Sequence, residues 1–209
     1  MSDDLEPGDL EPGDLEPGDL EQRTDSGSRR RVAPLIVGAV ALLMASLFWL
    51  LLTADTNVNK TAETPLLNQP APRSIGSFAD GRQFDLSRRK GSWVVLNFFT
   101  SNCDPCKREH PELVRFVEQQ QSLGIEAAEF YSIVQNDEPA AVEAFFAERG
   151  GDWPIVYDDQ YQFTNGFGVA QVPETWIIDP NGFVRGRIIS EVTADFLSIN
   201  IQTLREAGL

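Results

Sequence analysis

Cysteine and histidine are both scarce in this chain, which has two cysteines and one histidine among its 209 residues. Two cysteines cannot build a framework of several disulfides, and one histidine is too few for most zinc sites made of protein ligands alone. Basic side chains are also in the minority, since 17 Lys and Arg oppose 32 Asp and Glu and leave a net charge of −15. This charge argues against nucleic acid, or an anionic membrane surface, as the partner of the folded part.

The two cysteines that are present lie three positions apart, in Cys103-Asp104-Pro105-Cys106. An apolar run at residues 93–99 predicts a buried strand before them, and the pattern of residues 103–121 predicts a helix after them. Unpaired N–H groups in the first turn of a helix stabilise a thiolate, so we expect Cys103 to attack and the inward-facing Cys106 to resolve the mixed disulfide. Asp104 should oppose the helix dipole and make the pair more reducing. Half of a metal site, or two core cysteines, are the alternatives.

The N-terminal part has a different composition. Three copies of Leu-Glu-Pro-Gly-Asp fill residues 5–19, and their prolines and glycines predict a disordered acidic tail over residues 1–31. Residues 32–53 carry no charge, and 22 residues of helix, about 33 Å, can cross a hydrocarbon core of about 30 Å. Three arginines precede this run, so we expect a single transmembrane anchor with the N-terminus in the cytoplasm and the remaining chain outside. A cleaved signal peptide is the alternative.

The rest of the chain predicts a linker and one domain. Residues 54–72 are polar and contain prolines, as linkers do, and residues 73–209 are enough for one core. Asp80-Gly81 predicts a hairpin turn, and Asn136 or Asp137 is expected to cap a helix that starts near Pro139. Further strands are expected at residues 127–134, 174–179 and 183–189, and a last helix at residues 192–207. This order predicts an α/β fold with a mixed sheet and helices on both faces.

Two stretches of the domain resemble a known family. WVVLNFFTSNCDPCKREHPEL and GVAQVPETWIIDPNGFV look like the two signatures of the membrane-tethered thioredoxin-like oxidoreductases, the TlpA, ResA and CcmG (DsbE) group. The similarity covers about residues 70–209 and implies a thioredoxin-like fold with an N-terminal β-hairpin and a central strand-helix insert. It also implies reduction of the cysteines of apocytochrome c, or of other extracytoplasmic thiol proteins, with electrons from a CcdA-type membrane protein. We expect no bound cofactor and no metal.

The resemblance also assigns roles to single residues. It matches Cys103 and Cys106 to the redox-active disulfide, and Val172-Pro173 to a cis-proline whose neighbouring backbone pairs with substrate as an added strand. Glu109 and Glu174 match acidic residues near the active site, where a buried carboxylate can take the proton of Cys106. Solvated surface carboxylates are the alternative for both, and Asp137 is a further acidic candidate. The family commonly has tryptophan where this chain has Asn102, so the rim that meets the substrate differs.

Other interpretations use the same cysteines. The sequence does not set the direction of electron flow. A disulfide-forming oxidase for secreted proteins, which would use the same cysteine pair, therefore stays open. A thiol peroxidase is suggested by Thr100, three residues before Cys103, although Leu96 stands where such sites need proline. A copper metallochaperone would add His110 as a ligand, but we expect this histidine on the surface of its helix.

Overall fold

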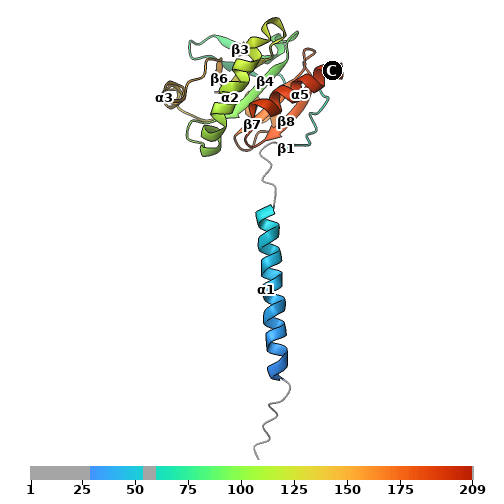
Figure 1. Ribbon diagram of the computed structural model, residues 1–209. Coiled ribbons are helices and arrows are strands. Elements are labelled where there is room, and N and C mark those ends of the chain that lie inside the picture. Colours follow the sequence, from blue (N-terminus) through green and yellow to red (C-terminus); the bar gives the residue numbers. More distant parts are fainter. Residues whose placement is uncertain (1–28, 54–59, 209) are drawn as a thin grey trace, which may run out of the picture. The chain divides into compact units, whose positions relative to one another are not determined.

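The computed structural model describes residues 29–53 and 60–208 (Figure 1). The chain divides into two units, residues 1–55 and residues 56–209, which are described separately. Residues 1–28, most of the predicted acidic tail, lie outside the described residues, as do residues 54–59 of the predicted linker.

The first unit contains helix α1 (Arg29–Thr53), which includes the uncharged run of the sequence. The side chains of residues 34–50 are exposed. Over the part of the chain that the structure describes, no helix combines the length and the apolarity needed to cross a membrane. The transmembrane anchor expected at residues 32–53 stays a prediction.

The second unit is built on an eight-stranded sheet with the strand order β1-β8-β7-β4-β5-β6-β2-β3. Its strands are β1 (Lys60–Thr61), β2 (Ile75–Ser77), β3 (Gln83–Asp85), β4 (Val94–Phe99), β5 (Glu129–Val134), β6 (Ile155–Tyr157), β7 (Glu174–Ile178) and β8 (Val184–Ile189). Neighbours β4, β5 and β6 are parallel, whereas every other pair is antiparallel. The predicted mixed sheet is therefore confirmed.

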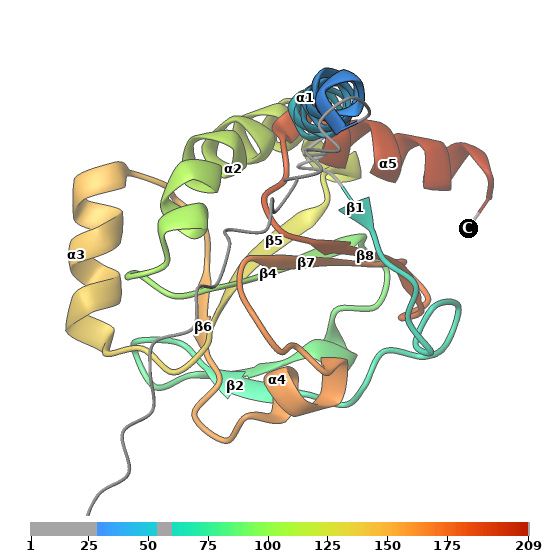
Figure 2. The ribbon, with the colours of Figure 1, turned by 90° about the horizontal axis from the view of Figure 1, so that it is seen from below.

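Helices cover both faces of this sheet (Figure 2). They are α2 (Asp104–Ser122), α3 (Pro139–Arg149), α4 (Gln162–Phe167) and α5 (Ala194–Glu206), with short 3-10 turns η1 (Leu86–Arg88) and η2 (Gly124–Glu126). Helices α2 and α5 lie on one face and α4 lies on the other. All six residues of β4 are buried because the strand lies between these two layers. The predicted strands and helices named above agree with the observed ones to within two residues at each end.

The predicted N-terminal hairpin is also confirmed. Strands β2 and β3 pair from Ile75 with Asp85 to Ser77 with Gln83. Gly81 in the turn has φ +81°, a conformation that glycine adopts without strain.

Residues 60–72, which we expected to be a linker, belong to the fold instead. The two residues of β1 pair with the last two residues of β8, and Pro70 forms a further bridge to Phe183. The backbone N–H of Asn68 also donates to Val184. Composition gave no sign of this, because an edge strand pairs through its backbone and tolerates polar residues and proline. The start expected at Arg73 is therefore too late.

The predicted cap of α3 is wrong as well. The N-cap position is Glu138, whose side chain makes no capping hydrogen bond. The carboxylate of Asp137 accepts from the backbone N–H of Ser101 at 2.5 Å and from that of Glu138 at 2.8 Å. Asp137 therefore connects the start of α3 to the loop that follows β4, a contact between residues 36 positions apart.

Candidate active site

Cys103 and Cys106 form a disulfide at the N-terminus of α2, with their Cα atoms 5.2 Å apart. Cys103 is the N-cap residue of the helix and is half-buried, whereas Cys106 lies in the first turn and is 3% exposed. The more accessible sulfur is thus the one that the sequence assigned to attack. Cys106 packs in a cluster with Phe99, Val134 and Phe145, where it is sheltered from solvent.

The surroundings of Cys103 favour a negative charge on its sulfur. Its Sγ accepts from the backbone N–H of Cys106 at 3.1 Å, which is the bond that a capping oxygen would make. This N–H and the helix dipole stabilise a thiolate when the disulfide is reduced. Asp104 beside it is exposed, and a hydrogen bond from Lys107 at 3.0 Å lowers the pKa of its carboxyl. Lys107 therefore offsets part of the opposing charge of Asp104.

The peptide bond between Val172 and Pro173 is cis, as the resemblance implies. The carbonyl oxygen of Val172 lies 3.7 Å from Cys103 Sγ, so this loop lies directly against the disulfide. Within residues 60–208 the backbone N–H of Val172 has no hydrogen-bond partner. A peptide laid beside Val172 would therefore meet a backbone donor that is free to pair.

Glu109 lies one helical turn after Cys106 and is 1% exposed. Its Oε1 accepts from the backbone N–H of Val192 at 2.9 Å, and its Oε2 accepts from Asn97 Nδ2 at 3.1 Å. Burial raises the pKa of Glu109 to about 8, although the bonds from Asn97 and Val192 act in the opposite direction. A carboxyl with this pKa can accept or release a proton near neutral pH.

Glu174, the second predicted acid, lies on the other face of the sheet. It shares its face of β7 with Trp176, on the side of α4, whereas Thr175 faces Asn97 and α2. Its carboxylate accepts two bonds from Arg187, at 3.0 and 3.1 Å, and one from Trp176 Nε1 at 2.7 Å. The structure therefore does not bring Glu174 together with Glu109.

His110 is buried, so the expectation that it lies on the helix surface is wrong. The residue is 3% exposed, and its ring packs edge-on against Phe145 and Phe146 of α3. Nε2 lies 2.8 Å from the carbonyl of Gly150 and donates to it, and burial lowers the pKa of the imidazole. This nitrogen is consequently not available as a third copper ligand beside the cysteine pair. The aromatic side chains of α3 contact His110, and the spacing of residues along α2 alone does not reveal a contact with so distant a segment.

The loop before Cys103 is held by polar contacts. Thr100 Oγ1 donates to the exposed Asn102 at 2.8 Å, and the N–H of Ser101 donates to Asp137. The Thr100 hydroxyl is therefore directed to Asn102 and not to the sulfur that a peroxidatic site would require it to meet. Asn102 gives the rim of the site a polar side chain where the family commonly has tryptophan.

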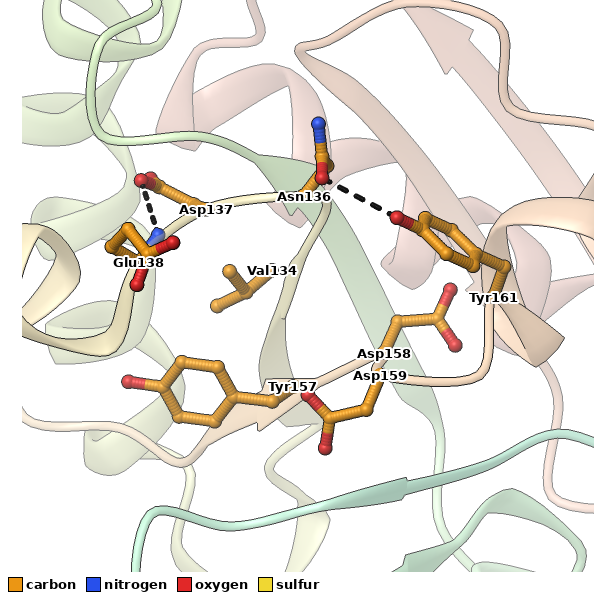
Figure 3. Close-up of a pocket in the computed structure, with 8 residues that line it drawn as sticks. All are labelled: Val134, Asn136, Asp137, Glu138, Tyr157, Asp158, Asp159 and Tyr161. Carbon is orange, nitrogen blue, oxygen red and sulfur yellow. Dashed lines mark hydrogen bonds between the residues drawn. The ribbon is translucent and has the colours of Figure 1, made fainter.

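Asp137, which accepts from Ser101 of this loop, also lines an acidic pocket of about 410 Å³ (Figure 3). Four carboxylates, of Asp137, Glu138, Asp158 and Asp159, contribute to its lining, together with Val134, Asn136, Tyr157 and Tyr161. The side chain of Asp158 accepts from the backbone N–H groups of Phe163 and Thr164, so it also fixes the start of α4. Among the residues that the structure describes, no group of three or more His, Cys, Asp or Glu side chains is arranged to hold a metal ion.

Three functional-site residues were missed in the sequence: Asn97, Thr175 and Arg187. Asn97 and Thr175 share a hydrogen bond beside Glu109, and Arg187 pairs with Glu174. For Asn97 the available signal was a single polar residue inside an otherwise apolar strand, VVLNFF. A buried polar side chain needs a partner, so such a residue indicates a second polar group across the core.

Comparisons with known proteins agree with this geometry. A model described as the AhpC/TSA family matches residues 67–187. The thiol-disulfide oxidoreductase ResA of Geobacillus thermodenitrificans is 31% identical over 167 residues, which cover 79% of this chain and 92% of ResA. The thiol:disulfide interchange protein HelX of Rhodobacter capsulatus is 30% identical over 136 residues, which cover 65% of this chain and 73% of HelX. The crystal structure of the thioredoxin domain of a Bacteroides vulgatus thiol-disulfide oxidoreductase superimposes with a TM-score of 0.57 at 19% identity, covering 68% of this chain and 99% of that domain. The expected thioredoxin-like fold is confirmed.

Proposed function

The chain belongs to the AhpC/TSA family and is a thiol–disulfide oxidoreductase of the ResA and HelX type, and from this premise we propose that it reduces the paired cysteines of apocytochrome c before haem attachment. The observation that carries the proposal is the Cys103–Cys106 disulfide, at a helix N-terminus and against a cis-proline loop. The same chemistry would also reduce other extracytoplasmic proteins that carry an oxidised cysteine pair.

Reduction of the substrate takes two exchange steps. The Cys103 thiolate attacks one sulfur of the substrate disulfide, a mixed disulfide forms, and the second substrate sulfur leaves as a thiolate that takes up a proton. Cys106 then loses its proton and attacks Cys103 Sγ, which releases the first substrate sulfur as a thiolate. Two electrons have passed to the substrate, and the protein is left with the disulfide between Cys103 and Cys106.

Glu109 is the proton acceptor for Cys106 in the second step. It follows Cys106 by one helical turn, a spacing that brings side chains of a helix within about 6 Å at Cβ. Its carboxyl is buried with Cys106 in the interior, and its pKa of about 8 suits proton exchange with a thiol. Glu174 has a different role in this proposal. Its hydrogen bonds from Arg187 and Trp176 fix the start of β7, which directly follows Pro173.

The substrate binds as an added strand beside Val172. The unpaired N–H of Val172 supports this, as does the position of its carbonyl near Cys103 Sγ. Pro173 is buried, and its carbonyl accepts from the N–H of Ser190 at 3.0 Å. This bond fixes the backbone next to Val172, where the substrate peptide would pair.

The domain works outside the cytoplasm, tethered by residues 32–53, with a CcdA-type membrane protein as its electron donor. The uncharged run, the three preceding arginines and the exposed side chains of residues 34–50 support the tether. Extraction of membranes with alkaline carbonate should leave the chain in the pellet, and an impermeant thiol reagent should label the reduced form of Cys103 in intact cells. Release of the chain by carbonate would contradict the tether. Labelling of Cys103 only after lysis would contradict the extracytoplasmic orientation.

The reduction potential decides between a reductase and an oxidase. A value near or below about −230 mV, measured by equilibration of the purified full chain with glutathione, would support the reductase. A value near about −120 mV, typical of strong oxidants of this fold, would overturn it in favour of disulfide formation.

A trapping experiment tests the substrate. The Cys106→Ser variant cannot carry out the second exchange, so it should accumulate as a mixed disulfide with an oxidised apocytochrome c peptide. The matched control, with both Cys103→Ser and Cys106→Ser, should trap nothing. If the single variant traps no more peptide than the double variant does, apocytochrome c is not the substrate.

A further inference from the structure

Asn97 is a polar residue in the middle of the central strand β4, and it is 1% exposed. Its neighbours along the strand, Leu96 and Phe98, belong to the apolar core. Burying an amide costs free energy unless hydrogen bonds replace those to water. A purely structural strand would do better with an apolar residue here, so the contacts of Asn97 require an explanation.

Only one half of the Asn97 amide is satisfied. Its Nδ2 donates to Glu109 Oε2 at 3.1 Å and to Thr175 Oγ1 at 3.1 Å. Its Oδ1 is buried and has no hydrogen-bond partner among the residues that the structure describes. A strong acceptor thus lies unused on the side chain that contacts the carboxyl group of Glu109.

The two oxygens of Glu109 have partners of different kinds. Oε1 accepts from the backbone N–H of Val192, a group that can only donate. Oε2 faces the amide of Asn97, which carries a donor on one side and an acceptor on the other. When Glu109 takes up a proton on Oε2, that oxygen becomes a donor and faces the Nδ2 donor. Half a rotation of the amide replaces Nδ2 by Oδ1, which can accept both from Glu109 and from the hydroxyl of Thr175.

We propose that Asn97 is the positioning residue for proton transfer at Glu109, with an amide that presents Nδ2 to the carboxylate and turns to present Oδ1 to the carboxylic acid. The unpartnered Oδ1 is then the acceptor that the protonated form uses. This inference rests on the proposed role of Glu109 as proton acceptor for Cys106. It adds a side chain that stabilises the carboxylate of Glu109 and so lowers the pH at which Glu109 exchanges its proton.

The charged side chains around Glu109 are paired with other residues, so Asn97 is the side chain whose hydrogen bond to Glu109 can change with protonation. Glu191, in the loop before α5, raises the pKa of Glu109 by repulsion, and it is itself paired with Arg108 of α2. Glu112, one turn further along α2, is paired with Arg115. Among the described residues no cationic side chain forms an ion pair with Glu109. The side-chain hydrogen bond that favours its charged form therefore comes from Asn97.

The first test replaces Asn97 by leucine, which has a similar shape and no hydrogen-bonding group. Removing the donor disfavours the carboxylate, so the midpoint of the Glu109 titration should rise, by about one pH unit for a bond to a charged group. The measurement is carbon-13 NMR of the Glu109 carboxyl in the reduced full chain, assigned by its loss in Glu109→Gln. The matched control is Gln120→Met, because Gln120 is also buried and its Oε1 accepts from the N–H of Ala128, away from Glu109.

The control separates positioning from stability. Both variants lose a buried hydrogen bond and should unfold more easily, but only N97L should shift the Glu109 midpoint. An unchanged midpoint in N97L, or an equal shift in Q120M, would overturn the proposal.

A second measurement needs no change at Asn97. In the unmodified chain, the side-chain NH₂ signals of Asn97 should titrate with the same midpoint as the Glu109 carboxyl, and they should stop titrating in E109Q. Signals that stay constant while Glu109 titrates would refute the turning amide.

The same variants distinguish this inference from the proposed proton transfer. If E109Q resolves the mixed disulfide with an unchanged rate and pH profile, Glu109 is not the proton acceptor, and the proposed function loses that step. The coupling between Asn97 and Glu109 would still be read from the two NMR titrations. If the titrations are uncoupled while E109Q is slow, Glu109 acts without Asn97.

Discussion

Replacing Glu109 by glutamine should abolish a pH dependence in the stability of the fold. Glutamine has the same shape as glutamate, and its amide oxygen can still accept from the N–H of Val192. Its NH₂ group would face Asn97, whose unused Oδ1 can accept from it. The substitution therefore removes the titration of residue 109 while leaving a hydrogen bond on each side.

The magnitude follows from the difference between the folded and unfolded chains. The pKa of Glu109 is raised by burial from its ordinary value of 4.5 to about 8. Because the folded pKa lies above the unfolded one, the contribution of Glu109 to stability is fully present below about pH 4.5 and is lost as the pH rises toward 8. At about 1.4 kcal/mol for each pKa unit, the loss across this window is roughly 5 kcal/mol.

Urea unfolding of the oxidised full chain at pH 5 and pH 9 measures this loss. Every other titrating group is common to the two proteins, so the difference between wild type and E109Q isolates residue 109. On going from pH 5 to pH 9, the free energy of unfolding of E109Q should rise relative to that of wild type by several kcal/mol. Parallel pH dependences in the two proteins would show that Glu109 does not carry a raised pKa, and the proton-transfer role would fall with it.

Three further substitutions test other parts of the site and fold. Changing Asp104 to glycine should make the reduction potential slightly less negative in a glutathione equilibrium; a more negative value would contradict the assignment. Changing Arg187 to alanine should lower the free energy of unfolding by about 3–5 kcal/mol, because the buried Glu174 carboxylate loses its partner, whereas methionine at both positions should cost much less. Equal losses in the single and double variants, measured by urea unfolding, would contradict this. Changing Gly76 to alanine should cost about 1–3 kcal/mol, because the added Cβ would lie 2.6 Å from Val156 Cγ1, and an unchanged Tm would refute that.

The elements of the domain could be predicted because their signals are local. The apolar run of β4, the glycine turn of the hairpin and the proline at the start of α3 each fix a backbone conformation within a few residues. The redox-active cysteine pair could be predicted as well, because its chemistry needs only two cysteines three positions apart at the start of a helix. These features depend little on what the rest of the chain does.

The partners of the site could not be predicted in the same way. Asn97 meets residues 12 and 78 positions away, and Asp137 meets a residue 36 positions away. His110 was expected at the surface because helical spacing shows only the side of α2 that faces the sheet, whereas the structure also packs Phe145 of α3 against the His110 ring. Glu109 and Glu174 were grouped by resemblance, but alternation along β7 places the sheet between them. Such contacts depend on the packing of distant segments, which no local pattern encodes.

The segment that leads into the domain has a protective consequence. By pairing along β8 through β1, Asn68 and Pro70, it covers backbone groups that would otherwise form an open border of the sheet. An uncovered border invites a second molecule to add its own strand. A chain shortened to begin at Arg73 should therefore self-associate at lower concentration than one that begins at residue 56, and the approach to Val172 would no longer be the preferred place for a foreign strand to attach.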